Sequence, residues 1–459
     1  MSSPSPIVIA SDWRGELRRL TQLGLPIAGA QLATMLMGLV DTIMLGRYST
    51  DAMAAAFLAN AILFGTLMFA NGILFGLDPL ITQAHGAGDG RASGLALQRG
   101  MLLALALSLP VALVCSFTGD ALRWSGQEEQ LAPLAQTYME ALLPSIPFFL
   151  CLSVLRQYLQ GREIVRPALY VTLAANVVNA LANWVLIFGN LGFPELGILG
   201  AGLATTTTRV ASLAGLAGLV LLGRLHRGAW DGLSREALDP KALWRITVIG
   251  FPVGIQTGTE MWAFNLSTFL AGWLGAAAAA AHGIVMNLAA ISFMLALGVA
   301  VATTTRVGNL IGAGLPDHAQ RASWIGMAMG AGVMSVSAVL FVVFREGLAS
   351  FYTLDARVVA LAAATLPVAA AFQVFDGTQV VGCGVLRGMG RTRPAALFNV
   401  VGYWLLGLPI GWWIGIREGW LGGLWWGLVL GLGVVAASLV VWVGFRGPKT
   451  LAAGERVRV

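Results

Sequence analysis

Acidic side chains inside long apolar runs are the residues of this sequence best suited to chemistry. Asp41 lies in VDTIMLG, Glu260 in GTEMWAF and Asp376 in VFDGTQVV, whereas Glu140 lies nearer the end of its apolar run. A carboxylate inside a membrane-spanning helix costs about 2.5–3.5 kcal/mol on insertion scales, so it requires a functional reason. Such a group can bind and release a proton, hold Na⁺ among other oxygen atoms, or attract an organic cation.

Amides and hydroxyls that suit the same chemistry follow in two later runs. Asn176, Asn179 and Asn183 lie in NVVNALANW, and residues 179 and 183 are four apart, so they share a helix face. Thr205 opens the run TTTT of the next apolar segment. Together with Asp41, these side chains form a candidate site for H⁺ or Na⁺. The alternative is that each one only joins neighbouring helices.

Two prolines occupy similar places in two of the runs. Pro26 and Pro252 each remove a helix hydrogen bond and favour a kink, which is either static or a hinge.

Apolar and aromatic side chains of the runs are mostly packing or lipid-facing residues, but some can receive flat cations in a cavity. The candidates for this substrate-binding role, beside the acids Asp41, Glu260 and Asp376, are Met35, Phe64, Trp262, Met286, Met294 and Phe375.

Other kinds of site find no support in the sequence. The four histidines and three cysteines are scattered, without the spacing of metal ligands or a disulfide framework. The lysines Lys241 and Lys449 do not complete a phosphate-binding loop, which excludes an ATP-driven pump on this chain alone. No Ser/His/Asp constellation with an elbow motif is present. We therefore expect neither an enzyme nor a bound cofactor.

The composition explains which elements must hold these residues. The chain has 459 residues, of which 57% are hydrophobic and 11% charged, against about 25% charged residues in soluble proteins. Long unbroken apolar runs predict helices that cross a membrane, rather than a barrel with alternating polarity. A large soluble catalytic domain is excluded.

Twelve spans are predicted, which makes the fold class an all-α membrane protein. Their expected limits are 18–45, 52–78, 94–118, 131–158, 167–190, 197–223, 243–274, 277–305, 320–344, 357–386, 394–416 and 419–445.

Basic residues are concentrated before the first span, in the loops that follow even-numbered spans, and after the last span. The positive-inside rule then predicts that both termini lie in the cytoplasm. The same distribution accounts for the net charge of +6 without a nucleic-acid partner. The N-terminal sequence lacks a short apolar core followed by a small-residue cleavage site, so no cleaved signal peptide is expected.

The two halves of the chain repeat each other. LRRLTQLGLP at 17–26 matches LWRITVIGFP at 243–252, and in the same register HGAGDG at 85–90 falls on IGAGLP at 311–316. The predicted organisation is an N-terminal segment 1–17, an N-lobe 18–223, a linker 224–242, a C-lobe 243–445 and a tail 446–459. Two parallel six-span lobes related by an axis along the membrane normal are typical of transporters with a cavity between the lobes.

The repeat also helps to judge the acids. In the register of those matches, Asp41 corresponds to Ser267 and Glu260 to Thr34. Because the fold repeats and the acids do not, the architecture itself does not require them, and a functional role is favoured.

Three segments resemble the multidrug and toxic compound extrusion (MATE) transporters, above all the NorM-type bacterial branch. They are VDTIMLG, GLDPLITQAHGAGD at 76–89 and DGTQVVGCGVLRGMGRTRP at 376–394, and the resemblance extends over residues 15 to 445. It implies a V-shaped pair of lobes that alternates access and exports organic cations in exchange for H⁺ or Na⁺.

The resemblance also implies roles for particular residues. Asp41, Asn179, Asn183 and Thr205 match the cation site of the N-lobe, which is the candidate Na⁺ site. Glu260 and Asp376 match the acids of the C-lobe, and Pro26 matches the proline where the first span bends. Asn183 stands where Asp is frequent, and Phe372 stands where some relatives have Tyr. Both departures make proton coupling at least as plausible as Na⁺ coupling.

The predicted function is a secondary active multidrug antiporter of the bacterial inner membrane, working as a monomer on cationic drugs and dyes. The alternatives are a major-facilitator transporter, a flippase of a related fold, and a channel or membrane enzyme. The loop GAGDGRASG at 86–94 fits the major-facilitator signature poorly. A flippase would need more buried basic residues than Arg209 alone.

Overall fold

The computed structural model describes residues 12–124, 130–229 and 232–451, and no strand occurs in those ranges. The first repeat contains α1 (Trp13–Tyr48), α2 (Thr50–Leu74), α3 (Leu77–Gly86), α4 (Gly90–Ser116), α5 (Thr118–Trp124), α6 (Leu131–Leu142), η1 (Leu143–Ser145), α7 (Ile146–Gly161), α8 (Arg166–Phe188), η2 (Asn190–Gly192) and α9 (Gly197–Leu222). After η3 (Arg235–Leu238), the second repeat contains α10 (Pro240–Trp273), α11 (Ala276–Gly312), α12 (Pro316–Val343), α13 (Arg345–Ser350), α14 (Ala356–Gly388), α15 (Arg393–Asn399), η4 (Val400–Gly407), α16 (Leu408–Gly411), η5 (Trp412–Arg417), α17 (Leu421–Arg446) and η6 (Pro448–Thr450).

These elements form the twelve predicted membrane-spanning segments. In the described ranges, 11 helical segments are long and apolar enough to cross a membrane. The twelfth is α10, which has 34 residues. Gln256, Glu260 and the neighbouring threonines make the middle of α10 more polar than the middle of the other spans. The segment that is least apolar thus holds one of the candidate acids.

Several spans are composite helices, a feature that the apolar runs did not reveal. The second span continues past a turn at Phe75 and Gly76 into α3, so it extends beyond the expected end at residue 78. The short 3₁₀ turn η1, which contains Pro144 and is followed by Pro147 in the first turn of α7, divides the fourth span into α6 and α7. The eleventh span is largely π-helical in η4 and η5.

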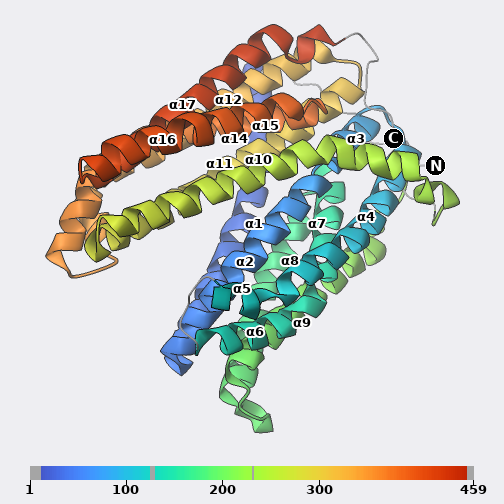
Figure 1. The fold of residues 1–459 in the computed structure, drawn as a ribbon. Coiled ribbons are helices and arrows are strands. Elements are labelled where there is room, and N and C mark those ends of the chain that lie inside the picture. The colour runs from blue at the N-terminus through green and yellow to red at the C-terminus, as the bar shows by residue number, and fades with distance from the viewer. Residues whose placement is uncertain (1–11, 125–129, 230–231, 452–459) are drawn as a thin grey trace.

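Each repeat has an apolar core of its own. One buried cluster is made almost entirely from α1 to α9, and a second from α10 to the C-terminal end of the described chain. A small third cluster, which includes Leu20, Leu23, Ile27 and Ala302, joins them. Figure 1 shows the two lobes diverging from the end of the molecule where both termini lie, which we call the terminal face.

The repeated GAG motifs meet each other at the terminal face. A Cβ on Gly86 would overlap the backbone oxygen of Asn309, and a Cβ on Gly312 would overlap the backbone oxygen of Gln83. Gly86 and Gly312 are equivalent positions of the repeat, and so are Gln83 and Asn309. The axis relating the lobes therefore passes between α3 and the end of α11.

Small residues bring the lobes together further along the same seam. Gly24 and Ala28 of α1 contact Gly298 of α11, and the equivalent pair Gly250 and Gly254 of α10 contacts α2 around Gly72. Glycine allows helix backbones this close an approach. The lobes thus pack on each other through α1 with α11 and through α2 with α10.

Ion pairs cross this seam, made by Arg306 with Glu16 and Glu163 and by Arg387 with Asp78. Arg306 of α11 is fully buried and donates to both carboxylate oxygens of Glu16 in α1. Arg387 of α14 lies 3.0 Å from Asp78 of α3. Buried residues recur along one face of α1 from Glu16 to Ala33, whereas none of the residues 34–44 is buried. The lobes are therefore closed at the terminal face and separated beyond it.

Candidate functional site

The polar residues predicted for the N-lobe come together in its interior. The Asn183 Nδ2 atom donates to Asp41 Oδ1 at 2.5 Å and to Asn179 Oδ1 at 3.3 Å. Asn179 and Asn183 are fully buried, and the helical spacing of four residues in α8 stacks them as predicted. Thr205 of α9 lies beside the same carboxyl group. Three helices thus hold one carboxylate among amides and a hydroxyl.

This N-lobe site has unused hydrogen-bonding capacity. Asn179 Nδ2, Asn183 Oδ1 and Thr205 Oγ1 are buried and make no hydrogen bond of regular geometry in the described part of the chain, although Asn179 and Thr205 lie close to the Asp41 carboxyl group. A buried polar atom without a partner costs about 1–3 kcal/mol, so such atoms commonly bind water or an ion. The donor set of carboxylate, amide oxygen and hydroxyl fits a small hard cation or a hydrated proton.

The N-lobe site also includes residues that sequence reasoning missed. Tyr138 of α6 is buried near Asp41 and accepts a hydrogen bond from Asn60 of α2 at 3.2 Å. Arg209 lies one helical turn beyond Thr205 in α9 and donates to Ser145 at 2.7 Å. Polar residues inside apolar runs were the available signal, but the approach of α2 and α6 depends on tertiary packing.

The two C-lobe acids lie close together. Asp376 of α14 is 4% exposed, and Glu260 of α10 is near enough for the two carboxyl groups to interact electrostatically. Gln379 lies beside Glu260, and Gln373 is fully buried with no partner for its amide in the described chain. Both glutamines are three residues from Asp376, on its side of the helix.

Aromatic rings and a further amide surround the C-lobe acids. Gln379 Nε2 donates to Asn399 Oδ1 at 3.0 Å. Tyr403 is fully buried near both acids, and its ring meets Phe264 edge-on with centroids 5.7 Å apart. Phe264 also contacts Phe372, with centroids 6.0 Å apart. The C-lobe acids therefore have amide and aromatic neighbours, and this environment differs in composition from the N-lobe site.

Some polar residues singled out from the sequence have ordinary contacts. Asn176 Nδ2 donates to the backbone oxygen of Ala33 at 3.0 Å, which joins α8 to α1. Glu140 is exposed and accepts a hydrogen bond from Gln136. Both agree with the plainer interpretation of these residues. Pro26 and Pro252 lie inside uninterrupted helices, and a hinge at either stays a prediction.

The apolar candidates for substrate binding are distributed over five helices. Phe64 is 49% exposed, Trp262 59% and Phe375 39%. Met35, Met286 and Met294 are half-buried. Their exposure leaves room for contact with a ligand or with lipid, so their roles stay predictions.

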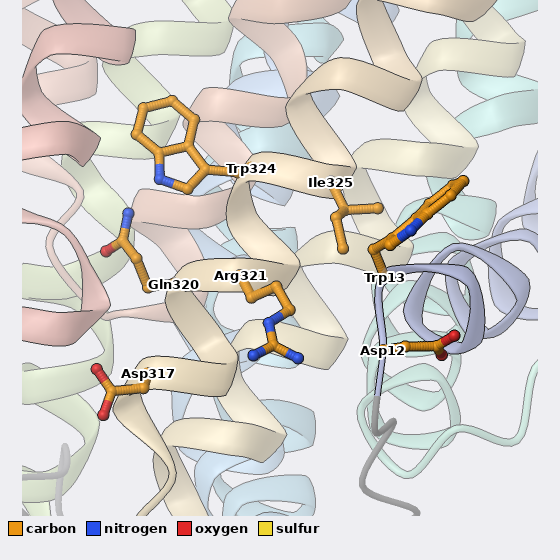
Figure 2. A pocket seen from close by; sticks show the side chains of 7 residues that line it. All are labelled: Asp12, Trp13, Asp317, Gln320, Arg321, Trp324 and Ile325. Carbon is orange, nitrogen blue, oxygen red and sulfur yellow. The ribbon is translucent and has the colours of Figure 1, made fainter.

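A separate pocket of about 610 Å³ lies at the terminal face. Figure 2 shows Asp12 and Trp13, at the start of α1, on the opposite side of the pocket from Arg321 and Ile325 of α12. None of the predicted site residues lines it. It spans the seam between the lobes rather than the interior of either one.

Two pseudo-symmetric six-helix lobes, each with buried carboxyl groups, define a two-lobed membrane transporter. The sequence profile of the MatE family matches the chain twice, over residues 26–185 and 252–413, once in each repeat. The chain therefore belongs to the MATE family, and specifically to its NorM-type bacterial branch, as the sequence motifs indicated.

Curated relatives resemble it over almost their whole length. The probable multidrug resistance protein NorM of Mesorhizobium japonicum is 35% identical over 449 residues, covering 93% of each chain. The multidrug resistance protein PmpM of Pseudomonas aeruginosa is 31% identical over 478 residues, covering 100% of this chain and 98% of PmpM.

Solved structures agree with the fold. The eukaryotic MATE transporter AtDTX14 superposes with a TM-score of 0.87 at 20% identity, covering 95% of this chain and 97% of AtDTX14. An outward-facing MATE family multidrug transporter superposes with a TM-score of 0.85 at 18% identity, covering 94% of this chain and 96% of that one. The predicted fold of twelve helices in two lobes is thereby confirmed.

Proposed function

We propose that the protein exports organic cations across the bacterial inner membrane in exchange for H⁺ or Na⁺, with both termini in the cytoplasm. The observation that carries this proposal is the N-lobe site, where one carboxylate, Asp41, is surrounded by buried amide and hydroxyl atoms that make no hydrogen bond of regular geometry among the described residues. A carboxylate in that setting exchanges one cation for another.

Coupling follows from competition for the same negative charge. In the state closed at the terminal face, an ion from outside reaches Asp41 and displaces the cationic substrate. The lobes then open at the terminal face, which is the cytoplasmic side in this proposal, and the ion leaves as a new substrate binds. Glu260 and Asp376 provide a second acidic site in the other lobe. Apolar residues such as Phe64 and Trp262 receive the flat parts of the substrate.

The names of the relatives support the substrate class, because NorM and PmpM are described as multidrug resistance proteins. The charge rule supports the orientation. Separate cores in the two lobes support function as a monomer, since neither lobe needs a second copy to complete a site.

The test is transport of a fluorescent cation in proteoliposomes, with pH and Na⁺ gradients imposed separately. We expect one of the gradients to drive efflux in the wild type and Asp41→Asn to abolish that efflux while leaving the thermal unfolding temperature close to the wild type. Efflux driven by neither gradient contradicts antiport. Full gradient-driven efflux in Asp41→Asn, Glu260→Gln and Asp376→Asn, each measured alone, contradicts the carboxylate mechanism.

A further inference from the structure

Arg209 is a charged residue in the middle of a membrane-spanning helix, α9. Such residues are rare and mark function by default, with a partner to be identified. Among the described residues, no carboxylate lies within the 4.0 Å of an ion pair with Arg209. The guanidinium of Arg209 is therefore held by contacts other than an ion pair.

Two neutral contacts hold the guanidinium. Nη1 donates to Ser145 Oγ at 2.7 Å, and the guanidinium carbon lies 5.0 Å from the centroid of the Phe149 ring. Ser145 belongs to the break η1, where Pro144 and Pro147 interrupt the fourth span and turn a buried hydroxyl toward α9. Neither contact neutralises a positive charge.

Asp41 is the acid with which Arg209 interacts electrostatically. Thr205, which lies beside Asp41, precedes Arg209 by four residues and shares its face of α9. Arg209 interacts electrostatically with three groups, namely Tyr138, Asp41 and Cys115, and Asp41 is the only carboxyl among them. Around Asp41, α8 presents Asn179 and Asn183, α9 presents Thr205 and Arg209, and α6 presents Tyr138. Within the described part of the chain, Arg209 is thus the one positive charge of the site.

We infer that Arg209 is a tethered counter-ion that competes with the coupling ion and the exported cation for Asp41. This inference rests on the proposed function. When Asp41 carries neither a proton nor a substrate, Arg209 swings from Ser145 and neutralises it. An arriving cation displaces Arg209 onto Ser145 and Phe149, the two contacts that its guanidinium makes in the structure. This competition limits the affinity of Asp41 for the exported cation, so that the cation can dissociate.

Arginine suits this role better than lysine. Its planar guanidinium can stack on Phe149 and bond Ser145 in one position, then present a flat pair of N–H donors to a carboxylate in the other. An ammonium group keeps the charge but loses the stacked position.

The test measures binding of tetraphenylphosphonium to the purified full-length protein as a function of pH. At high pH we expect Arg209→Gln to lower the dissociation constant by up to about tenfold, since a competing charge is gone. Arg209→Gln also removes the charge that competes with protons for Asp41, so Asp41 should hold its proton to a higher pH. The pH at which tetraphenylphosphonium binding appears should therefore rise by up to about one unit. Arg209→Lys should stay closer to the wild type. The matched control is Arg417→Gln, which removes a charge that stacks on Trp413 in the other lobe, and it should change neither quantity.

A second variant predicts the opposite sign. Ser145→Ala frees Arg209 without removing it, so Arg209 competes better and the dissociation constant should rise several-fold. In an Asp41→Asn background, neither Arg209→Gln nor Ser145→Ala should have a further effect on binding. If Arg209 had only a structural role, Arg209→Gln and Ser145→Ala would change the dissociation constant by similar factors in the wild-type and the Asp41→Asn backgrounds.

The outcomes separate this inference from the proposed function. Equal binding by the wild type and Asp41→Asn contradicts the proposed site. Asp41-dependent binding that Arg209→Gln leaves unchanged, or that Ser145→Ala tightens, overturns the counter-ion inference alone. If Arg209→Gln does not fold, Ser145→Ala and Arg209→Lys still decide the question, because both keep the buried charge.

Discussion

Arg306 forms a bidentate ion pair with Glu16 across the seam between the lobes. The Nε atom of Arg306 lies 2.6 Å from Oε1 and the Nη2 atom 3.0 Å from Oε2, and both side chains are almost completely buried. These residues are 290 positions apart and belong to different lobes. Separating the lobes at the terminal face must break this bidentate pair, so it favours the state that the structure adopts.

We expect Glu16→Gln to shift the protein toward the state that is open at the terminal face. Removing one partner of a buried ion pair costs up to about 3–5 kcal/mol, and Glu163, 3.8 Å from Arg306, offsets part of that cost. Electron–electron distance measurements between spin labels at positions 87 and 317, in a chain whose three cysteines are replaced, should show a longer distance in this variant.

The matched control for this shift is Glu236→Gln. Glu236 pairs with Arg91, but both side chains are more than half exposed, and such pairs contribute about 0–1 kcal/mol. An unchanged distance distribution in Glu16→Gln would mean that other contacts hold the seam.

The repeated glycines at the terminal face give a second prediction. Gly86→Ala and Gly312→Ala each place a methyl group against backbone of the other lobe, so each should destabilise the closed seam by about 1–3 kcal/mol. Thermal unfolding of the purified protein should show a lower transition temperature for both variants, by similar amounts.

Gly218→Ala in α9 is the control for the glycine variants, because open space surrounds that position. A helical Gly→Ala change there should stabilise the protein by about 0.5–1 kcal/mol. Transition temperatures for Gly86→Ala and Gly312→Ala that matched Gly218→Ala would contradict the close packing.

Sequence reasoning reached the N-lobe site because most of its geometry is local. Asn179 and Asn183 share a face by helical periodicity alone, and the rarity of acids in apolar runs singled out Asp41. The contacts of Arg306 were out of reach, since a residue near a span end gives no sign of its partner across a lobe interface. The internal repeat revealed the GAG motifs but not that they touch, because an axis of symmetry is set by tertiary packing.

The amide at position 183 offers a third prediction. Asn183→Asp puts a second carboxyl group where the Asn183 amide now lies 2.5 Å from Asp41. Two carboxylates at that distance cannot both ionise, so they hold a shared proton more tightly. We expect proton-driven transport by this variant to persist to a higher external pH than in the wild type, measured as initial rates in proteoliposomes across a pH series.

Asn176→Asp is the matched control for that change. It makes the same substitution two turns earlier in α8, where the amide bonds the backbone of Ala33. It should lower stability without moving the pH profile. A profile that moved equally in both variants would assign the effect to the net charge of α8 rather than to Asp41.

The C-lobe acids give a last prediction, which concerns coupling between two residues. Because Glu260 and Asp376 interact electrostatically, neutralising one removes the repulsion that the other experiences when both are ionised. Effects of Glu260→Gln and Asp376→Asn on transport should therefore not add, and the double variant should differ from the sum of the singles by about 0.5–3 kcal/mol. Initial rates under separate pH and Na⁺ gradients provide the four values of the cycle.

Pairing Glu260→Gln with Asp41→Asn, in the other lobe, supplies the comparison, and this pair should be closer to additive in substrate binding. Additive effects for Glu260 and Asp376 would mean that each acid binds its ion alone.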